Sequence, residues 1–172
     1  MADLSLDLCG VKLKNPIIAA SGTFGFGREY DELYDIGQLG GISVKGLSLL
    51  PRTGNPPSRI AETPSGMLNS VGLQNPGVEN FIRFELGELK KYSFIEEQIP
   101  FLRRYDTKII ANVSGNTVEE YEGMVEKISA ADVDLIEMNI SCPNVHEGGV
   151  AFGVKPESVY AITKAVKAAA RQ

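Results

Sequence analysis

The sequence has few of the residues that build disulfide scaffolds or metal centres. Its 172 residues include two cysteines, one histidine and no tryptophan. Cys9 and Cys142 lie far apart and form no metal-spaced pair, and a disulfide between them is not expected in a reducing compartment. We expect Cys9 to pack within a hairpin. His146 lies in a Glu/Gly loop typical of the surface, and metal ligation would need partners that the chain lacks.

The sequence also lacks an excess of positive charge and any long apolar run. Its 17 Lys and Arg residues face 22 Asp and Glu residues, a net charge of -5, which argues against binding to the phosphate backbone of a nucleic acid. A small anionic substrate needs only one well-placed cation. No apolar run approaches the roughly 20 residues of a membrane span, and the first residues do not resemble a signal peptide. These absences predict a cytoplasmic protein without a membrane span.

What is present is the composition of a folded globular protein, with 43% hydrophobic and 23% charged residues. The length alone suggests one domain. Alternating apolar residues in 4–13 predict a hairpin. Strands and helices then alternate along the chain, which indicates an α/β fold with parallel strands joined by right-handed crossovers. The predicted strands are 17–20, 41–46, 108–113 and 134–140, and the predicted helices are 28–36, 78–89, one capped by Asn116 with Glu119, and one that starts at Pro156.

Residues 47–76 interrupt this alternation. The segment is rich in proline and has no helical period, so it is predicted to be a long loop that includes a small hairpin. Loops of this length within a compact domain are usually functional.

Each predicted strand has a polar side chain at or next to its carboxyl end, at Ser21, Lys45, Asn112 and Asn139. The carboxyl ends of parallel strands meet at one rim, where ligands bind. The alternative is that polar residues simply mark strand ends. Lys45 carries more information, because a lysine directly after a buried strand must be desolvated or paired, unless its ammonium extends to water. At the rim it could stabilise a carboxylate or an anionic ring.

Two loops after strands have their own patterns. The glycines of 22–27 are ordered G-x-x-G-x-G, which is not the dinucleotide fingerprint; contact with a flat ligand and simple turn chemistry both explain them. Cys142, after the fourth strand, is placed to act as a thiol base or nucleophile. The alternative for a lone cysteine is a small buried apolar residue.

Residues 139–144, 69–76 and 43–46 together resemble the class 1 dihydroorotate dehydrogenases, and residues 20–27 and 148–153 resemble the NAD-dependent subclass (1B). The similarity runs through essentially the whole chain. It implies a TIM (β/α)8 barrel, of which this chain covers an N-terminal hairpin and about the first four βα units. Residues 1–172 are thus expected to be the amino-terminal half of a single FMN-binding barrel domain, since a whole barrel needs about 250 residues.

The resemblance also implies an activity, the oxidation of (S)-dihydroorotate to orotate in pyrimidine (UMP) biosynthesis, with FMN as hydride acceptor and Cys142 as the base. It implies flavin contacts from Ala20, Ser21, Lys45, Gly46, Asn112 and Asn139. The substrate contacts that it implies are Lys45, Asn69, Ser70, Val71, Gly72, Leu73, Asn139 and Asn144.

In this subclass, electrons pass to NAD through a partner subunit that carries FAD and an iron–sulfur cluster, and catalytic subunits form a homodimer within a heterotetramer. With two cysteines, this chain cannot hold such a cluster by itself. Two alternatives stay open. The chain could be an inactive half-barrel that needs its carboxyl-terminal half, or it could resemble the dihydropyrimidine dehydrogenases, which share the Asn-x-Ser-Cys-Pro pattern.

Overall fold

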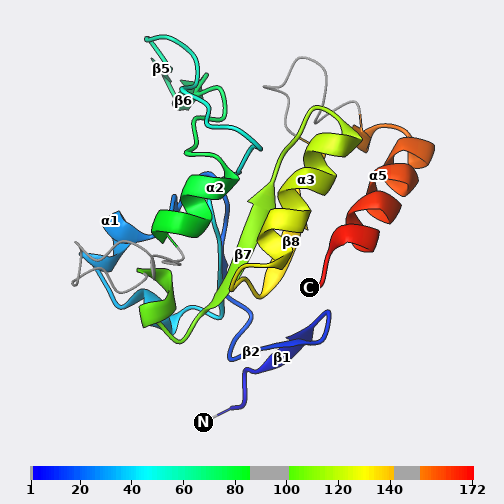
Figure 1. Ribbon diagram of the computed structural model, residues 1–172. Coiled ribbons are helices and arrows are strands. Elements are labelled where there is room, and N and C mark those ends of the chain that lie inside the picture. Colours follow the sequence, from blue (N-terminus) through cyan, green and yellow to red (C-terminus); the bar gives the residue numbers. More distant parts are fainter. Residues whose placement is uncertain (1, 86–100, 142–151) are drawn as a thin grey trace, which may run out of the picture.

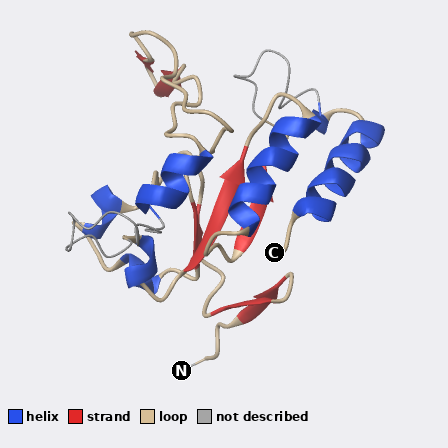
Figure 2. Cartoon of the chain, in the orientation of Figure 1, coloured by secondary structure: helices blue, strands red, loops and turns tan. Residues whose placement is uncertain are grey.

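The predicted parallel sheet is confirmed. The computed structural model describes residues 2–85, 101–141 and 152–172. Four parallel strands form one sheet in the order β3-β4-β7-β8 (Figures 1 and 2). Each strand therefore pairs with the one that precedes it in this sheet, as successive βα units require. The strands are β3 (Ile18–Ala19), β4 (Gly41–Ser43), β7 (Lys108–Val113) and β8 (Leu135–Met138).

Helices cover one face of this sheet, where α3 packs against β7 and α5 lies beside α3 (Figure 1). The core between the layers consists of aliphatic strand residues such as Ile42 and Val113, packed against helix residues such as Met124 and Ile162. The helices are α1 (Arg28–Asp31), α2 (Val78–Asn80), α3 (Val118–Ser129) and α5 (Pro156–Ala169). Short 3-10 segments span Ile36–Gln38 and Leu102–Arg104, and a π-helical turn spans Phe81–Glu85.

Side-chain alternation along the strands separates this core from a second, polar face. Ile109, Ala111 and Val113 of β7 belong to the core beneath the helices. Asn112 lies between two of them in sequence and is buried as well. Because successive side chains of a strand point to opposite faces, Asn112 faces away from the helices. The face of the sheet away from the helices, called the inner face below, thus carries polar groups. The functional site lies on this side of the sheet.

The two predicted hairpins are present. The first pairs β1 (Leu6–Leu8) with β2 (Val11–Leu13), and the second, from the proline-rich loop, pairs β5 (Ile60–Thr63) with β6 (Gly66–Asn69). The expected packing of Cys9 is wrong. Cys9 is exposed, with φ 53°, because it is a turn residue of a two-residue hairpin loop, which requires left-handed backbone conformations.

The helix predicted over 28–36 is shorter than expected. It ends at Asp31, and Leu33 and Tyr34, which lie beyond its end, are 78% and 39% exposed. Asp35 begins a separate 3-10 turn, because its side chain accepts the backbone N–H of Gly37 at 2.8 Å. Of the helix predicted over 78–89, the structure describes only residues 78–85.

The start of α3 was misplaced by one residue. The N-cap is Thr117, not Asn116, and its Oγ1 accepts the N–H of Glu120 at 3.2 Å. Glu120 Oε2 in turn accepts the N–H of Asn116 at 2.6 Å. Thr117 and Glu120 therefore hold the start of the helix in place of Asn116 and Glu119, but Glu120 accepts from the residue before the cap, so the box is a variant of the usual one.

Thr117→Ala is expected to lower the free energy of unfolding by about 1 kcal/mol, because the first turn of α3 loses its side-chain acceptor. Urea denaturation followed by circular dichroism measures this loss. Thr117→Ser keeps the hydroxyl and is expected to unfold close to the wild-type midpoint. Equal stability of the alanine and serine variants would contradict this role of the threonine.

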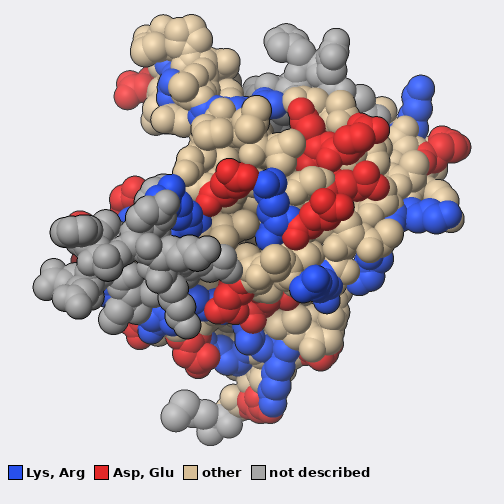
Figure 3. All heavy atoms as spheres, viewed as in Figure 1, with Lys and Arg blue, Asp and Glu red and all other residues tan. Residues whose placement is uncertain are grey.

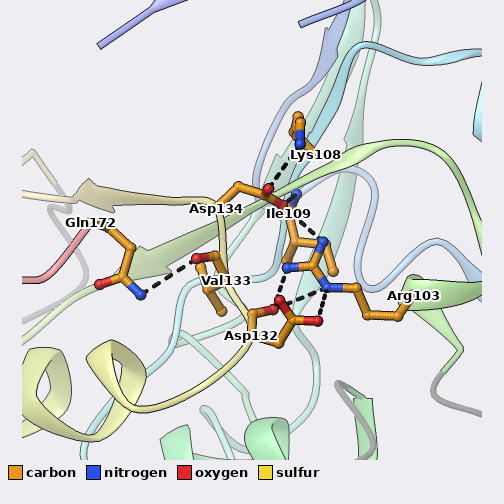
Figure 4. Close-up of polar contacts among 7 residues, drawn as sticks. All are labelled: Arg103, Lys108, Ile109, Asp132, Val133, Asp134 and Gln172. Atoms are coloured by element: carbon orange, nitrogen blue, oxygen red, sulfur yellow. Dashed lines mark hydrogen bonds and ion pairs between the residues drawn. The ribbon is translucent and has the colours of Figure 1, made fainter. Parts of the chain in front are cut away.

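A cluster of charged groups joins the beginnings of β7 and β8 (Figure 4). Asp134 accepts the backbone N–H of Ile109 at 2.9 Å, Lys108 Nζ at 3.1 Å and Arg103 Nη1 at 2.9 Å. Burial raises the pKa of Asp134, but these three donors outweigh burial, so that the pKa lies below its ordinary value. Asp134 thus links a helical turn to both strands as a carboxylate.

Acidic side chains gather over α3 on the face that Figure 3 shows. The sequence of this helix, from Val118 to Ser129, holds four glutamates and one lysine. Among the residues that the structure describes, no helix is long and apolar enough to cross a membrane.

Candidate active site

A cavity of about 760 Å³ lies at the carboxyl ends of the four parallel strands. This is the rim at which ligands bind to parallel α/β folds. Nine of the residues assigned to the flavin or substrate site in the sequence line this cavity. They are Ala20, Ser21, Lys45, Gly46, Asn69, Val71, Leu73, Asn112 and Asn139.

The remaining predicted residues are not seen to line it. Ser70 instead supports the loop, where its Oγ accepts Asn55 Nδ2 at 2.9 Å. Gly72 has φ 74°, and a Cβ there would lie 2.7 Å from the backbone nitrogen of Asn55. Cys142 and Asn144 lie outside the described residues. Ser141, which directly precedes Cys142 in the sequence, lines the cavity.

Lys45 brings positive charge to the cavity. Lys45 is half-buried, and its backbone N–H donates to Gly25 O at 3.0 Å. Within residues 2–85, 101–141 and 152–172, no hydrogen bond or ion pair of its ammonium is found. It is the only cation among the described lining residues. A cation in this position favours an anionic ligand.

Ser43 and Glu137 also line the cavity, although neither is predicted from the sequence as a site residue. Ser43 Oγ donates to Glu137 Oε2 at 2.8 Å, and Asn112 Nδ2 donates to Glu137 Oε1 at 2.5 Å. The signal was the strand period of two: Ser43 precedes Lys45 by two residues, and Glu137 precedes Asn139 by two. Each therefore shares a strand face with a residue that had been assigned to the site.

Close contacts hold the strand ends together around the cavity. Ser21 Oγ donates to Val44 O at 2.7 Å, which joins the chain after β3 to the chain after β4. A Cβ at Gly46 would lie 3.0 Å from Asn112 Oδ1 and 3.0 Å from Leu73 Cδ1. Glycine therefore allows these segments to lie closer together than they could with a larger residue at position 46.

Asn75 shapes the loop that covers the cavity. This buried side chain accepts the N–H groups of Ser48 at 3.1 Å and Gly77 at 2.9 Å, and it donates to Leu73 O at 2.7 Å. Leu73 is 8% exposed and has φ 52°, in the left-handed region. An apolar residue in this conformation is costly, so the bonds of Asn75 help to keep Leu73 at the cavity wall.

The described residues suit a flat, polar heteroaromatic group such as the ring system of FMN. The volume falls in the range of small-molecule and cofactor sites. The amides of Asn112 and Asn139 can pair with ring carbonyl and N–H groups, and Gly46 leaves the backbone bare. Within the described residues, the cavity has no comparable set of groups for a metal ion, since no cluster of three or more His, Cys, Asp or Glu side chains is present.

Parallel strands that alternate with helices, and a polar cavity at the strand ends, define this chain as part of a ligand-binding α/β barrel. The sequence profile of the family described as dihydroorotate dehydrogenase matches residues 3–172. The chain belongs to the dihydroorotate dehydrogenase family.

Curated relatives agree. A protein of Thermoanaerobacter pseudethanolicus, named "dihydroorotate dehydrogenase B (NAD(+)), catalytic subunit", is 53% identical over 96% of this chain and 50% of its own length. A protein of Alkaliphilus metalliredigens with the same name is 55% identical over 99% of this chain and 52% of its own length. The chain thus spans about half the length of these relatives.

A solved structure shows the same fold. The dihydroorotate dehydrogenase of Eimeria tenella, crystallised with ferulenol, superimposes with a TM-score of 0.68. The match covers 97% of this chain and 44% of the other, at 16% sequence identity. The predicted barrel class is confirmed, with this chain corresponding to part of such a barrel.

Proposed function

We propose that residues 1–172 form the amino-terminal half of a single FMN-binding barrel domain in the catalytic subunit of an NAD-dependent dihydroorotate dehydrogenase. The reaction is the oxidation of (S)-dihydroorotate to orotate in UMP biosynthesis. The observation that carries this proposal is the meeting of Lys45 with two asparagine amides in one cavity. A cation beside paired donors and acceptors suits a pyrimidine-dione that bears a carboxylate.

Each residue has a role in this proposal. Lys45 holds the substrate carboxylate and balances negative charge on the flavin, and Asn139 contacts both molecules. FMN, when bound, accepts the hydride that leaves carbon 6. Further substrate contacts are assigned to Asn69, Ser70, Val71, Gly72, Leu73 and Asn144, and further flavin contacts to Ala20, Ser21, Gly46 and Asn112.

Cys142 is the proposed base, which takes the proton from carbon 5 of the substrate. An ordinary thiol is only a few per cent ionised at neutral pH. A cation in the same site favours the thiolate, and Lys45 is the group proposed to supply this effect. Cys142→Ser is expected to slow turnover by a factor of about 10² or more, in the range found when a general base is removed.

The proposal includes partners. The names of the relatives, which end in "catalytic subunit", support an additional subunit, which we propose transfers electrons to NAD through FAD and an iron–sulfur cluster. A homodimer of catalytic subunits within a heterotetramer is part of the same proposal. A cytoplasmic location stays a prediction from the sequence.

The test is a hybrid in which the remaining carboxyl-terminal part of the Alkaliphilus metalliredigens relative follows Gln172. We expect the hybrid to retain FMN, to change its flavin absorbance on titration with orotate, and to oxidise dihydroorotate faster than dihydrouracil. The 172-residue chain alone is expected to show no turnover. A folded hybrid without an orotate-dependent spectral change would contradict the proposed function, and faster oxidation of dihydrouracil would favour the dihydropyrimidine dehydrogenase alternative.

A further inference from the structure

We infer that Glu137 is a positioning residue that sets the direction of the Asn112 and Asn139 amides in the cavity. The inference rests on the proposed function, because it assumes that these amides meet the flavin and the substrate. It adds to that function a specific role for a carboxylate on the inner face of the sheet.

The geometry begins with strand register. Asn112 of β7 and Glu137 of β8 are direct cross-strand partners. Both oxygens of the carboxylate are occupied, Oε1 by Asn112 Nδ2 at 2.5 Å and Oε2 by Ser43 Oγ at 2.8 Å. Ser43 and Asn112 are each 1% exposed. Glu137 thus joins three neighbouring strands by side-chain bonds.

An ionised carboxylate only accepts hydrogen bonds, and this fixes the orientation of the first amide. Asn112 must turn its Nδ2 toward Glu137, which directs its Oδ1 to the opposite side. There Oδ1 lies 3.5 Å from Asn139 Nδ2, which donates to it. Without the carboxylate, the two orientations of the Asn112 amide would differ far less in energy.

The second amide is held from its other end. Asn139 Oδ1 accepts the backbone N–H of Ser141 at 3.2 Å and the Ser141 hydroxyl at 3.3 Å. Its Nδ2 has two N–H groups and gives one to Asn112, so that one remains for a ligand. The pair therefore offers an accepting oxygen from Asn112 next to a donating N–H from Asn139. This order is complementary to a ring edge on which an N–H lies beside a carbonyl.

The position of the carboxylate is otherwise hard to explain. The inner positions of α/β barrels are mostly filled by branched apolar residues, and a carboxylate there must be stabilised by hydrogen bonds. In the described residues, no cation pairs with Glu137, which makes a purely ion-pairing role a poor account. A function in orienting amides explains both of its bonds.

The test compares Glu137→Leu with Glu137→Gln. Glutamine can keep an oxygen toward Asn112 while its amide donates to Ser43 Oγ, whereas leucine removes both acceptors. The first readout is the side-chain amide NMR signals of Asn112 and Asn139 in the ligand-free 172-residue chain. We expect these signals to shift strongly in the leucine variant and to stay near their wild-type positions in the glutamine variant.

The second readout is FMN affinity in the hybrid protein described above. Leucine is expected to weaken binding about tenfold, the value of one lost hydrogen bond of about 1.4 kcal/mol, and glutamine to restore most of it. Glu126→Leu, on the exposed side of α3, is the matched control and should bind like the wild type. If Glu137→Leu does not fold, Glu137→Ala is assessed by the same two measurements.

The two proposals fail in different ways. Unchanged signals of both amides in a folded leucine or alanine variant would overturn the role of Glu137, whether or not FMN binds. Undiminished FMN binding by such a variant would overturn it as well. A wild-type hybrid that does not bind FMN would instead contradict the proposed function, and the amide signals would still decide the role of Glu137.

Discussion

Lys45→Met is expected to weaken orotate binding by about 10- to 100-fold in the hybrid protein. A hydrogen bond to a charged group contributes about 1.5–3 kcal/mol, and each 1.4 kcal/mol is tenfold in affinity. Methionine keeps most of the apolar stem, so the cavity wall changes little. The lysine is half-buried, and within the described residues its ammonium has no other partner. The substitution is therefore expected to remove an interaction with the ligand and none within the protein. Titration of flavin absorbance with orotate measures it.

Two controls separate charge from packing. Lys167→Met removes an exposed lysine from α5, far along the chain from the cavity, and should bind orotate like the wild type. Raising the salt concentration should weaken binding to the wild type more than to Lys45→Met, because only the wild type has the cation to screen. Equal orotate affinities of the wild type and Lys45→Met would rule out this role.

Asp134→Asn is expected to lower the free energy of unfolding by about 3 kcal/mol. The side chain is 15% exposed and receives three donors. An asparagine has one acceptor oxygen and turns an N–H₂ group toward at least one of these donors. Removing one member of a buried charge pair typically costs about 3–5 kcal/mol, and the partial exposure places this site at the low end. Urea denaturation at pH 7 measures the change.

Asp132→Asn is the matched control. Asp132 also pairs with Arg103, at 2.8 Å, but its side chain is 72% exposed. Exposed ion pairs contribute about 0–1 kcal/mol, so this variant should unfold close to the wild type. If both variants lost the same stability, burial at Asp134 would not be the source of its effect.

Acid should remove the difference between the wild type and Asp134→Asn. The folded-state pKa of Asp134 lies below its ordinary value of 3.8, so its contribution is fully present above that value. It is lost as the pH falls below about 4 and through the lowered pKa. Unfolding free energies from pH 7 to pH 3 should therefore converge for the two proteins. A constant difference over this range would show that the ionised carboxylate is not responsible.

The parts of the fold that follow from periodicity were predictable. The apolar run of 108–113 has the same first and last residues as β7, and Pro156 begins α5 as expected. The errors in predicting where helices begin and end lie at positions where local side-chain hydrogen bonds decide the boundary. Thr117 and Asn116 are both capable of capping α3, and only the bonds of Glu120 show which of them does.

The site was predictable at strand ends and less so within strands. Asn112 and Asn139 can be predicted because they lie at the ends of apolar runs, whereas the period of two gives only the strand face of Glu137 and not its partners. Its importance depends on register: Glu137 lies opposite Asn112, and pairing between distant segments is not contained in either segment alone. The same holds for Ser43, whose partner is 94 residues away in the sequence.

The strand order described above also bears on how this chain is synthesised. In the order β3-β4-β7-β8 every strand pairs with its immediate predecessor in the sheet, so that no strand has to wait for a later one. Chains emerge from the ribosome amino terminus first, and domains form as units when their contacts are local. Each strand can therefore add to the edge of the sheet that is already formed, but because these residues are proposed to be half of one barrel domain, we expect the nascent chain to acquire full protection from protease only after the rest of the barrel has left the exit tunnel.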